Sequence, residues 1–197
     1  KNRLNNIHRS PKVDSLDNAS EFLNKYNTLN AKVEDIEDSR LYADSYYSKR
    51  CLILCSGFFE WQKVKKEKVP YYITLKEDEM FVFAGIWNET IDSKGKSIKS
   101  YAILTIEANE FMANIHNTKK RMPLILSPEN AKQWINPDLS PNELKSIINP
   151  LTSEQFKAHT IKRFLPGNAK NLNTSDIVAY YNYPQIGDIL NSNNTLF

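Results

Sequence analysis

The segment from residue 51 to residue 107 decides the fold, because it contains four consecutive apolar and aromatic runs. They are CLILCSGFFEW (51–61), PYYITLKE (70–77), MFVFAGIWNE (80–89) and SYAILTIE (100–107). Runs rich in β-branched and aromatic residues, separated by short polar stretches, predict consecutive β-strands. The charged segment KVKKEK (63–68) lies between the first two runs, so we interpret it as a solvated hairpin tip.

Helical patterns flank these strands on both sides. The predicted helices cover residues 17–26, 41–46, 109–115, 128–135 and 143–148, and a further strand is expected at 158–163. Ser127 and Ser140 each precede a proline, which is a combination typical of a helix start. We therefore predict one α+β domain spanning residues 1–197, with a mainly antiparallel, barrel-like sheet flanked by helices.

The composition excludes several classes of protein. A chain of 197 residues with 41% hydrophobic and 25% charged residues is neither collagen-like, disordered nor a repeat array. Its longest apolar runs, such as CLILC (51–55), have five residues, far short of the roughly 20 that a membrane-spanning helix needs. With no signal peptide and only two cysteines, we expect a soluble, cytoplasmic protein. The net charge of +3 does not by itself indicate a nucleic-acid partner.

Most standard catalytic motifs are absent from the chain. There is no phosphate-binding glycine-rich loop, no dinucleotide fingerprint, no HExxH and no paired CxxC. Cys51 and Cys55 could share a metal ion with His116, but their apolar neighbours favour buried structural thiols. We expect no metal and no other cofactor.

Glu60 is the first candidate for a chemical role. It follows two phenylalanines and precedes Trp61 at the end of an apolar run. Burial in such surroundings would raise the pKa of the carboxyl group by desolvation and make it a proton donor or acceptor near neutral pH. Strand alternation alone favours the simpler alternative, a carboxylate that points into solvent.

His116 is the second candidate, because it ends the helical pattern ANEFMANIH (108–116) just before a loop. In that position its ring could act as a general acid or base at the rim of a pocket. A helix-terminal histidine that merely interacts with the helix dipole is an equal alternative. Asn30, in TLNAK, could orient a substrate, although one asparagine among 22 is weak support.

Several segments together resemble one known family. TLNAKVE, RCLILCSGFFEW, PYYI, FAGIW, ILT, IHNTKKRMPLIL and NAKN occur in that order across most of the chain. The chain is similar in these blocks to the SOS-response-associated peptidase (SRAP) family. GFFEW and the IH…RMP element are the most specific of them.

The resemblance implies a DNA-damage-response protein with an α+β, barrel-like fold. Proteins of this family act on abasic sites in single-stranded DNA through an N-terminal cysteine, exposed by autoproteolytic removal of the initiator methionine. The cysteine amine forms a Schiff base with the open sugar, and its thiol closes a thiazolidine. By motif, Asn30 matches the asparagine that positions the cysteine, Glu60 the proton-shuttling glutamate and His116 the acid/base histidine.

The resemblance also indicates DNA-contacting positions. Lys32 replaces an arginine of the asparagine motif, while Arg40 and Arg121 match basic positions that face DNA in the family. Trp61 could pack beside a base or the Glu60 carboxylate, with core filling as the favoured alternative. The insertion NTKK (117–120) adds positive charge near the expected site. We expect a monomer whose partner is single-stranded DNA and which is nucleoid-associated when bound.

One element that the resemblance implies is missing from the sequence. A thiazolidine requires a free amine and a thiol on one residue, but the α-nitrogens of Cys51 and Cys55 both lie in peptide bonds. The sequence starts at Lys1, so we expect that a segment carrying the nucleophile precedes it.

Two other functions stay open. The first is a non-catalytic single-stranded DNA-binding module that has lost its nucleophile. The second is a peptidase acting on other proteins, which is less favoured because neither Ser56 nor the cysteines have an identifiable base partner in the sequence.

Overall fold

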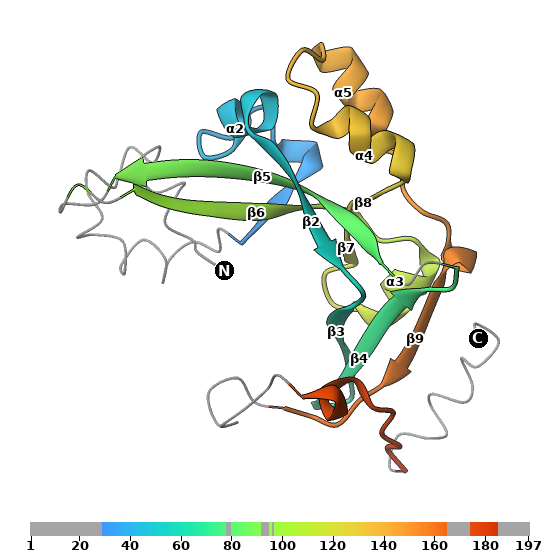
Figure 1. Ribbon diagram of the computed structural model, residues 1–197. Coiled ribbons are helices and arrows are strands. Elements are labelled where there is room, and N and C mark those ends of the chain that lie inside the picture. Colours follow the sequence, from blue (N-terminus) through green and yellow to red (C-terminus); the bar gives the residue numbers. More distant parts are fainter. Residues whose placement is uncertain (1–28, 78–79, 92–94, 96, 165–173, 185–197) are drawn as a thin grey trace. The chain divides into compact units, whose positions relative to one another are not determined.

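The computed structural model describes residues 29–77, 80–91, 95, 97–164 and 174–184 (Figure 1). The predicted helix at 17–26 and the NAKN segment lie outside these residues. The described chain forms two compact units, each assembled from segments distant in sequence. Unit 1 contains the residues up to Leu54 together with Val82–Ile106 and Pro123–Pro150, and unit 2 contains the rest. The single domain predicted from the sequence stays a prediction.

Unit 1 is built on a sheet with the strand order β1-β6-β5-β2. Its strands are β1 (Asn30–Lys32), β2 (Arg50–Cys55), β5 (Phe81–Ile91) and β6 (Ser97–Glu107), and the short β8 (Ile125–Leu126) pairs with β5. β5 pairs with β6 and β8 antiparallel, whereas β1 pairs with β6 parallel. Its helices are α2 (Ala43–Ser48), α4 (Pro128–Trp134), α5 (Pro141–Ile147) and the 3-10 helix η3 (Val33–Asp35).

Two side chains organise the interior of unit 1. The indole of Trp134 is fully buried, and its Nε1 donates to the carbonyl oxygens of Cys51 and Gly85, both at 3.2 Å. The guanidinium of Arg50 is buried as well and donates to four backbone carbonyls. Its acceptors are those of Tyr46, Tyr47, Trp134 and Asn136. The first two lie in the last turn of α2, Trp134 ends α4 and Asn136 follows it shortly after, so Arg50 satisfies carbonyls that lack intrahelical partners.

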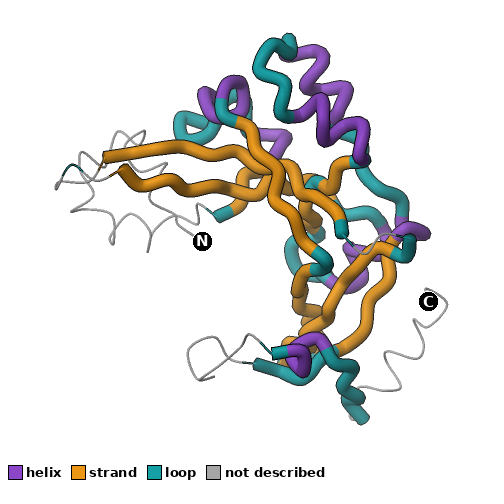
Figure 2. Tube along the Cα trace, viewed as in Figure 1, coloured by secondary structure: helices purple, strands orange, loops and turns teal. Residues whose placement is uncertain are grey.

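Unit 2 contains a three-stranded antiparallel sheet in the order β3-β4-β9 (Figure 2). The strands are β3 (Phe58–Val64), β4 (Glu67–Leu75) and β9 (Phe156–Thr160). The helices are α3 (Glu110–Ile115), η4 (Ser153–Gln155) and η5 (Ser175–Val178), and the short strand β7 (Arg121–Pro123) follows the loop after α3. Phe111 of α3 stacks on Phe156 of β9, with ring centroids 5.7 Å apart.

The described residues confirm the α+β class and most predicted elements. Ser127 and Ser140 cap α4 and α5, each with its proline in the first turn. The hairpin between β3 and β4 has its exposed turn at Lys65 and Lys66, as predicted.

The interpretation of residues 51–61 as one continuous strand run is wrong. These residues form two strands, β2 and β3, which belong to two different sheets. The break contains Gly57, where a Cβ atom would lie 2.3 Å from the Tyr72 ring, so only glycine fits without rearrangement. The last predicted strand is also displaced, since β9 ends at Thr160. Among the described residues, no helix is long and apolar enough to cross a membrane.

Candidate functional site

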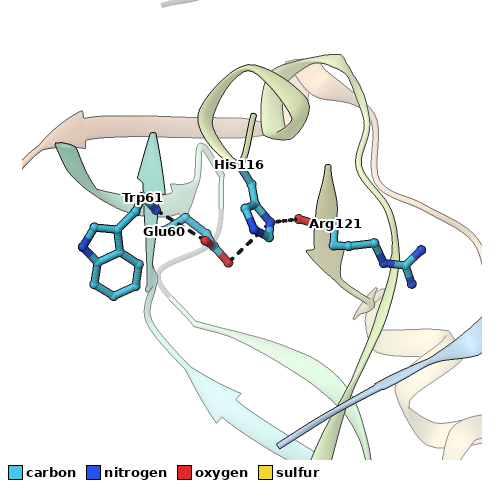
Figure 3. A network of polar contacts seen from close by, with 4 residues as sticks. All are labelled: Glu60, Trp61, His116 and Arg121. Atoms are coloured by element: carbon cyan, nitrogen blue, oxygen red, sulfur yellow. Dashed lines mark hydrogen bonds and ion pairs between the residues drawn. The ribbon is translucent and has the colours of Figure 1, made fainter. Parts of the chain in front are cut away.

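Glu60 and His116 lie close together in unit 2. Glu60 belongs to β3, and His116 directly follows α3 (Figure 3). His116 Nδ1 and Glu60 Oε1 are 4.0 Å apart, and the two side chains are 19% and 23% exposed. The pair therefore combines partial burial with access to solvent, which a group that exchanges protons with a substrate requires.

Local sequence explains why these side chains meet. In β3, Gln62 and Val64 are buried, and strand alternation places Glu60 on the same face. The helix α3 is capped by Asn109, whose side chain accepts from the Met112 amide at 2.9 Å. Its buried side chains are Phe111, Met112 and Ile115. His116 therefore stands at a helix end fixed by the packing of α3.

Two sets of polar contacts join β3, just after Glu60, to the residues that flank His116. Gln62 Nε2 donates to the Asn114 carbonyl at 2.9 Å, while its Oε1 accepts from the Tyr71 hydroxyl at 3.1 Å. The Asn117 side chain accepts from the Lys63 amide and donates to the Lys63 carbonyl, both at 2.9 Å. These bonds fix the strand of Glu60 relative to the loop of His116.

The contacts of His116 define its neutral tautomer. Nδ1 lies 2.8 Å from the Arg121 carbonyl oxygen, which can only accept a hydrogen bond. Nδ1 therefore carries a proton, and the lone pair of the neutral ring is on Nε2. The 4.0 Å separation from Glu60 exceeds hydrogen-bonding distance, so the two side chains are close without a direct hydrogen bond.

Burial dominates the electrostatics of Glu60. Desolvation raises the pKa of its carboxyl group above the usual value. The charge of His116 and a hydrogen bond from the Trp61 amide, 3.4 Å long, oppose this rise in pKa. The carboxyl group consequently holds its proton at a higher pH than an exposed glutamate.

The raised pKa predicts how Glu60→Gln changes stability with pH. A carboxyl group with a higher pKa in the folded state stabilises the protein below its unfolded-state pKa, and this contribution is lost as pH rises through the folded-state pKa. Relative to Glu60→Gln, the wild-type free energy of unfolding should fall as pH rises above about 4, the pKa of a glutamate in the unfolded chain. Urea unfolding at several pH values measures this difference. If the free energy of unfolding of the wild type instead rose with pH relative to that of Glu60→Gln, the burial of Glu60 would be contradicted.

The other predicted residues of unit 2 are arranged differently. Trp61 alternates with Glu60 and faces the opposite side of β3, where its ring contacts Phe164 with centroids 6.1 Å apart. Arg121 contributes its carbonyl to His116, and its half-buried side chain extends away from the imidazole (Figure 3).

Asn30, Lys32 and Arg40 belong to unit 1, and all three are exposed. Asn30 starts β1, opposite Ile103 of β6. The Lys32 ammonium lies 3.9 Å from an Asp35 carboxylate oxygen. The convergence of Asn30 with Glu60 and His116 stays a prediction.

The two cysteines are half-buried rather than fully buried as the sequence suggested. Desolvation raises the pKa of each thiol to about 11, so both are protonated at neutral pH and are poor nucleophiles. Within the described ranges, no group of three or more His, Cys, Asp or Glu residues could hold a metal ion.

Sequence reasoning missed Gln62 and Asn117. Gln62 could have been found, because it lies two residues after Glu60 and therefore on the same face of the strand. Asn117 carries no comparable signal in a chain with 22 asparagines. Its role depends on a contact with the backbone of a strand more than 50 residues away.

Comparison with known proteins identifies the family. The sequence model of the family "SOS response associated peptidase (SRAP)" matches residues 13–165, and the chain belongs to this family. It is 32% identical over 160 residues to the abasic site processing protein YoaM of Bacillus subtilis, covering 80% of this chain and 68% of YoaM. It is 30% identical over 145 residues to the abasic site processing protein YedK of Escherichia coli, covering 73% of this chain and 63% of YedK.

A solved structure agrees with the family assignment. A crystal structure of a protein from Bacteroides thetaiotaomicron superposes with a TM-score of 0.77 at 32% identity, covering 86% of this chain and 72% of that one. The chain spans only half the length of the abasic site processing protein HMCES of Xenopus tropicalis.

Proposed function

We propose that this protein responds to DNA damage by coupling covalently to abasic sites in single-stranded DNA. The observation that carries the proposal is the half-buried Glu60–His116 pair in a member of the SRAP family, whose curated relatives are named abasic site processing proteins. The nucleophile we propose is an N-terminal cysteine outside residues 1–197. The chain would then be a single SRAP-type domain completed by that preceding segment.

The proposed reaction balances without a cofactor. The cysteine α-amine attacks the aldehyde carbon of the open deoxyribose, a C–N bond forms, and the former carbonyl oxygen leaves as water. The thiol sulfur then adds to the imine carbon, and its proton passes to the nitrogen. The product is a thiazolidine that joins protein to DNA.

Two steps of this reaction need proton transfer. The amine must lose a proton before it attacks, and the carbinolamine oxygen must gain one before it leaves. His116 would accept the first proton on Nε2, and Glu60 would supply the second, because burial keeps its carboxyl group protonated to higher pH. The same pair would serve hydrolytic removal of the initiator methionine, the peptidase activity of the proposal. Water would add to the methionine carbonyl carbon as the C–N bond breaks, and the pair would protonate the leaving cysteine amine.

The remaining predicted residues complete the proposed site. Asn30 would orient the N-terminal cysteine through its amide. Lys32, Arg40 and Arg121 would bind phosphates, and Lys32 would do so as a point charge without the planar fork of arginine. Trp61 would contact DNA only on the face of β3 opposite Glu60.

The test is an adduct assay with the full-length gene product. A denaturing gel should show a heat-stable adduct with an oligonucleotide that contains one abasic site, and none with an undamaged oligonucleotide. Substitution of the N-terminal cysteine by alanine should abolish the adduct. An adduct that survives this substitution, or no adduct with the wild type, would overturn the proposal.

The alternative of a non-catalytic DNA-binding module makes a distinct prediction. Such a module would bind single-stranded DNA in a salt-dependent manner without forming an adduct. Its affinity would be unaffected by Glu60→Gln and His116→Ala.

A further inference from the structure

The segment NTKK (117–120) forms the turn that leads from His116 to Arg121, and we call it the 117–120 turn. Its last residue has an unusual backbone conformation. Lys120 has a φ of 49°, in the left-handed region that glycine or asparagine occupies at lower cost. In the described part of the chain, the only other non-glycine residue with positive φ is Lys65, with a φ of 55°.

Hydrogen bonds fix this turn at both of its ends. At its start, the Asn117 side chain accepts from the Lys63 amide and donates to the Lys63 carbonyl. At its end, the Lys120 amide donates to the His116 carbonyl at 2.9 Å, and the Lys120 carbonyl accepts from the Ala108 amide at 3.0 Å. A left-handed residue whose amide bonds the carbonyl four residues earlier is a common way to reverse a chain after a helix. The positive φ of Lys120 thus belongs to the path of the turn.

The path of the turn brings the carbonyl of the next residue to the imidazole of His116. The Arg121 oxygen lies 2.8 Å from Nδ1 (Figure 3). Because this oxygen can only accept, Nδ1 carries the proton and Nε2 keeps its lone pair. A neutral imidazole without such a partner can carry its proton on either nitrogen. The backbone of the turn therefore decides which ring nitrogen is free.

We propose that Lys120 is a positioning residue whose left-handed backbone conformation selects the Nδ1–H tautomer of His116. This inference rests on the proposed function, in which Nε2 accepts a proton from the attacking amine. The φ angle at residue 120, rather than the charge of its side chain, sets the fraction of molecules with a free Nε2. Residues that adopt the left-handed conformation readily should therefore replace the lysine without loss.

Two substitutions at position 120 remove the same charge but differ in backbone preference. Lys120→Gly favours the left-handed conformation, whereas the β-branched side chain of Lys120→Val disfavours it. Lys65→Gly and Lys65→Val form the matched control pair, because Lys65 has the same conformation at the tip of the β3–β4 hairpin, outside the 117–120 turn. All four variants are made in the full-length gene product.

Nitrogen NMR of protein with isotope-labelled histidine measures the tautomer at alkaline pH, where the rings are neutral, because protonated and unprotonated ring nitrogens have well separated signals. The signals of His116 are those that disappear in His116→Ala. His159 supplies the opposite reference in the same spectrum. Its Nε2 lies 2.7 Å from the Val178 carbonyl oxygen, so in His159 the proton is on Nε2.

Wild type and Lys120→Gly should both show His116 as the Nδ1–H tautomer, whereas Lys120→Val should show a mixture of the two tautomers. Both Lys65 variants should keep the wild-type pattern. A wild-type pattern in folded Lys120→Val, or a mixture in folded Lys120→Gly, would overturn the proposal. Circular dichroism verifies folding, and should valine unfold the protein, the glycine variant alone decides between these outcomes.

A second measurement connects the tautomer to the reaction. At saturating abasic DNA, the single-turnover rate should be several-fold lower for Lys120→Val than for Lys120→Gly, because only molecules with a free Nε2 can accept the proton. Their affinities for undamaged single-stranded DNA should stay equal, since both have lost the same charge. Equal rates in spite of different tautomers would overturn the role of Lys120 in the reaction.

These experiments separate the two proposals. The spectra need no DNA, so they report on Lys120 even if the covalent function fails. The adduct assay with wild-type protein still reports on the proposed function if the tautomer is independent of residue 120.

Discussion

Replacing His116 with alanine is expected to slow adduct formation with abasic DNA by about 10²–10⁴-fold, the range typical of a lost general acid or base. The Arg121 carbonyl holds the Nδ1 proton of the ring, so Nε2 is the nitrogen that can take a proton from the attacking amine. Alanine removes this nitrogen and leaves the strand of Glu60 in place. Single-turnover gel assays of the full-length protein at neutral pH and saturating DNA measure the rate.

His159 provides a matched control for this substitution. It is also half-buried and also contacts a backbone carbonyl, with Nε2 2.7 Å from the Val178 oxygen. It lies opposite Tyr72 in the sheet, on the face away from Glu60. His159→Ala should therefore leave the rate within a few-fold of wild type. Equal rates for wild type and His116→Ala would remove His116 from the mechanism, and partial rescue by added imidazole would support its role.

Replacing Arg50 with methionine is expected to lower the free energy of unfolding by about 3 kcal/mol or more, because it leaves buried carbonyls without donors. Arg50 donates to the ends of both α2 and α4, including the Trp134 carbonyl at 2.6 Å and the Tyr47 carbonyl at 2.6 Å. Methionine fills much of the same volume but donates no hydrogen bond. Urea unfolding followed by circular dichroism measures the loss.

Arg40→Met is the control for this prediction. Arg40 is exposed in the same unit, so its substitution should change stability by less than about 0.5 kcal/mol. A small loss for Arg50→Met, similar to that of the control, would show that water or neighbouring groups satisfy these carbonyls.

Local signals in the sequence were sufficient for many secondary elements. The serine–proline pairs at 127–128 and 140–141 mark helix starts, because the hydroxyl caps the first turn and proline needs no donor there. The charged KVKKEK segment marks a hairpin tip, because a run of charged side chains between two apolar strands favours solvent. The break at Gly57 was missed because it depends on the Tyr72 ring, which packs from the neighbouring strand.

The orientation of Glu60 could not be deduced from alternation. A strand of period two fixes which residues share a face, but it does not say which face is covered. In unit 2 the helix α3 covers the face of Gln62, through its bond to the Asn114 carbonyl, and this half-buries Glu60. The family resemblance pointed to Glu60 and His116, which lie 4.0 Å apart, and their catalytic roles stay a prediction. The Gln62 and Asn117 contacts that hold them required the structure.

A double-mutant cycle tests most directly whether Glu60 and His116 act as one proton-transferring unit. The single-turnover rate of adduct formation is measured for wild type, Glu60→Gln, His116→Ala and the double variant, all as full-length protein with the same abasic oligonucleotide. If the pair acts together, the double variant should be about as slow as the slower single variant, because groups that act as a unit are strongly non-additive. Single-variant rates equal to wild type, or a double variant whose slowing is the product of the two single effects, would contradict a shared role.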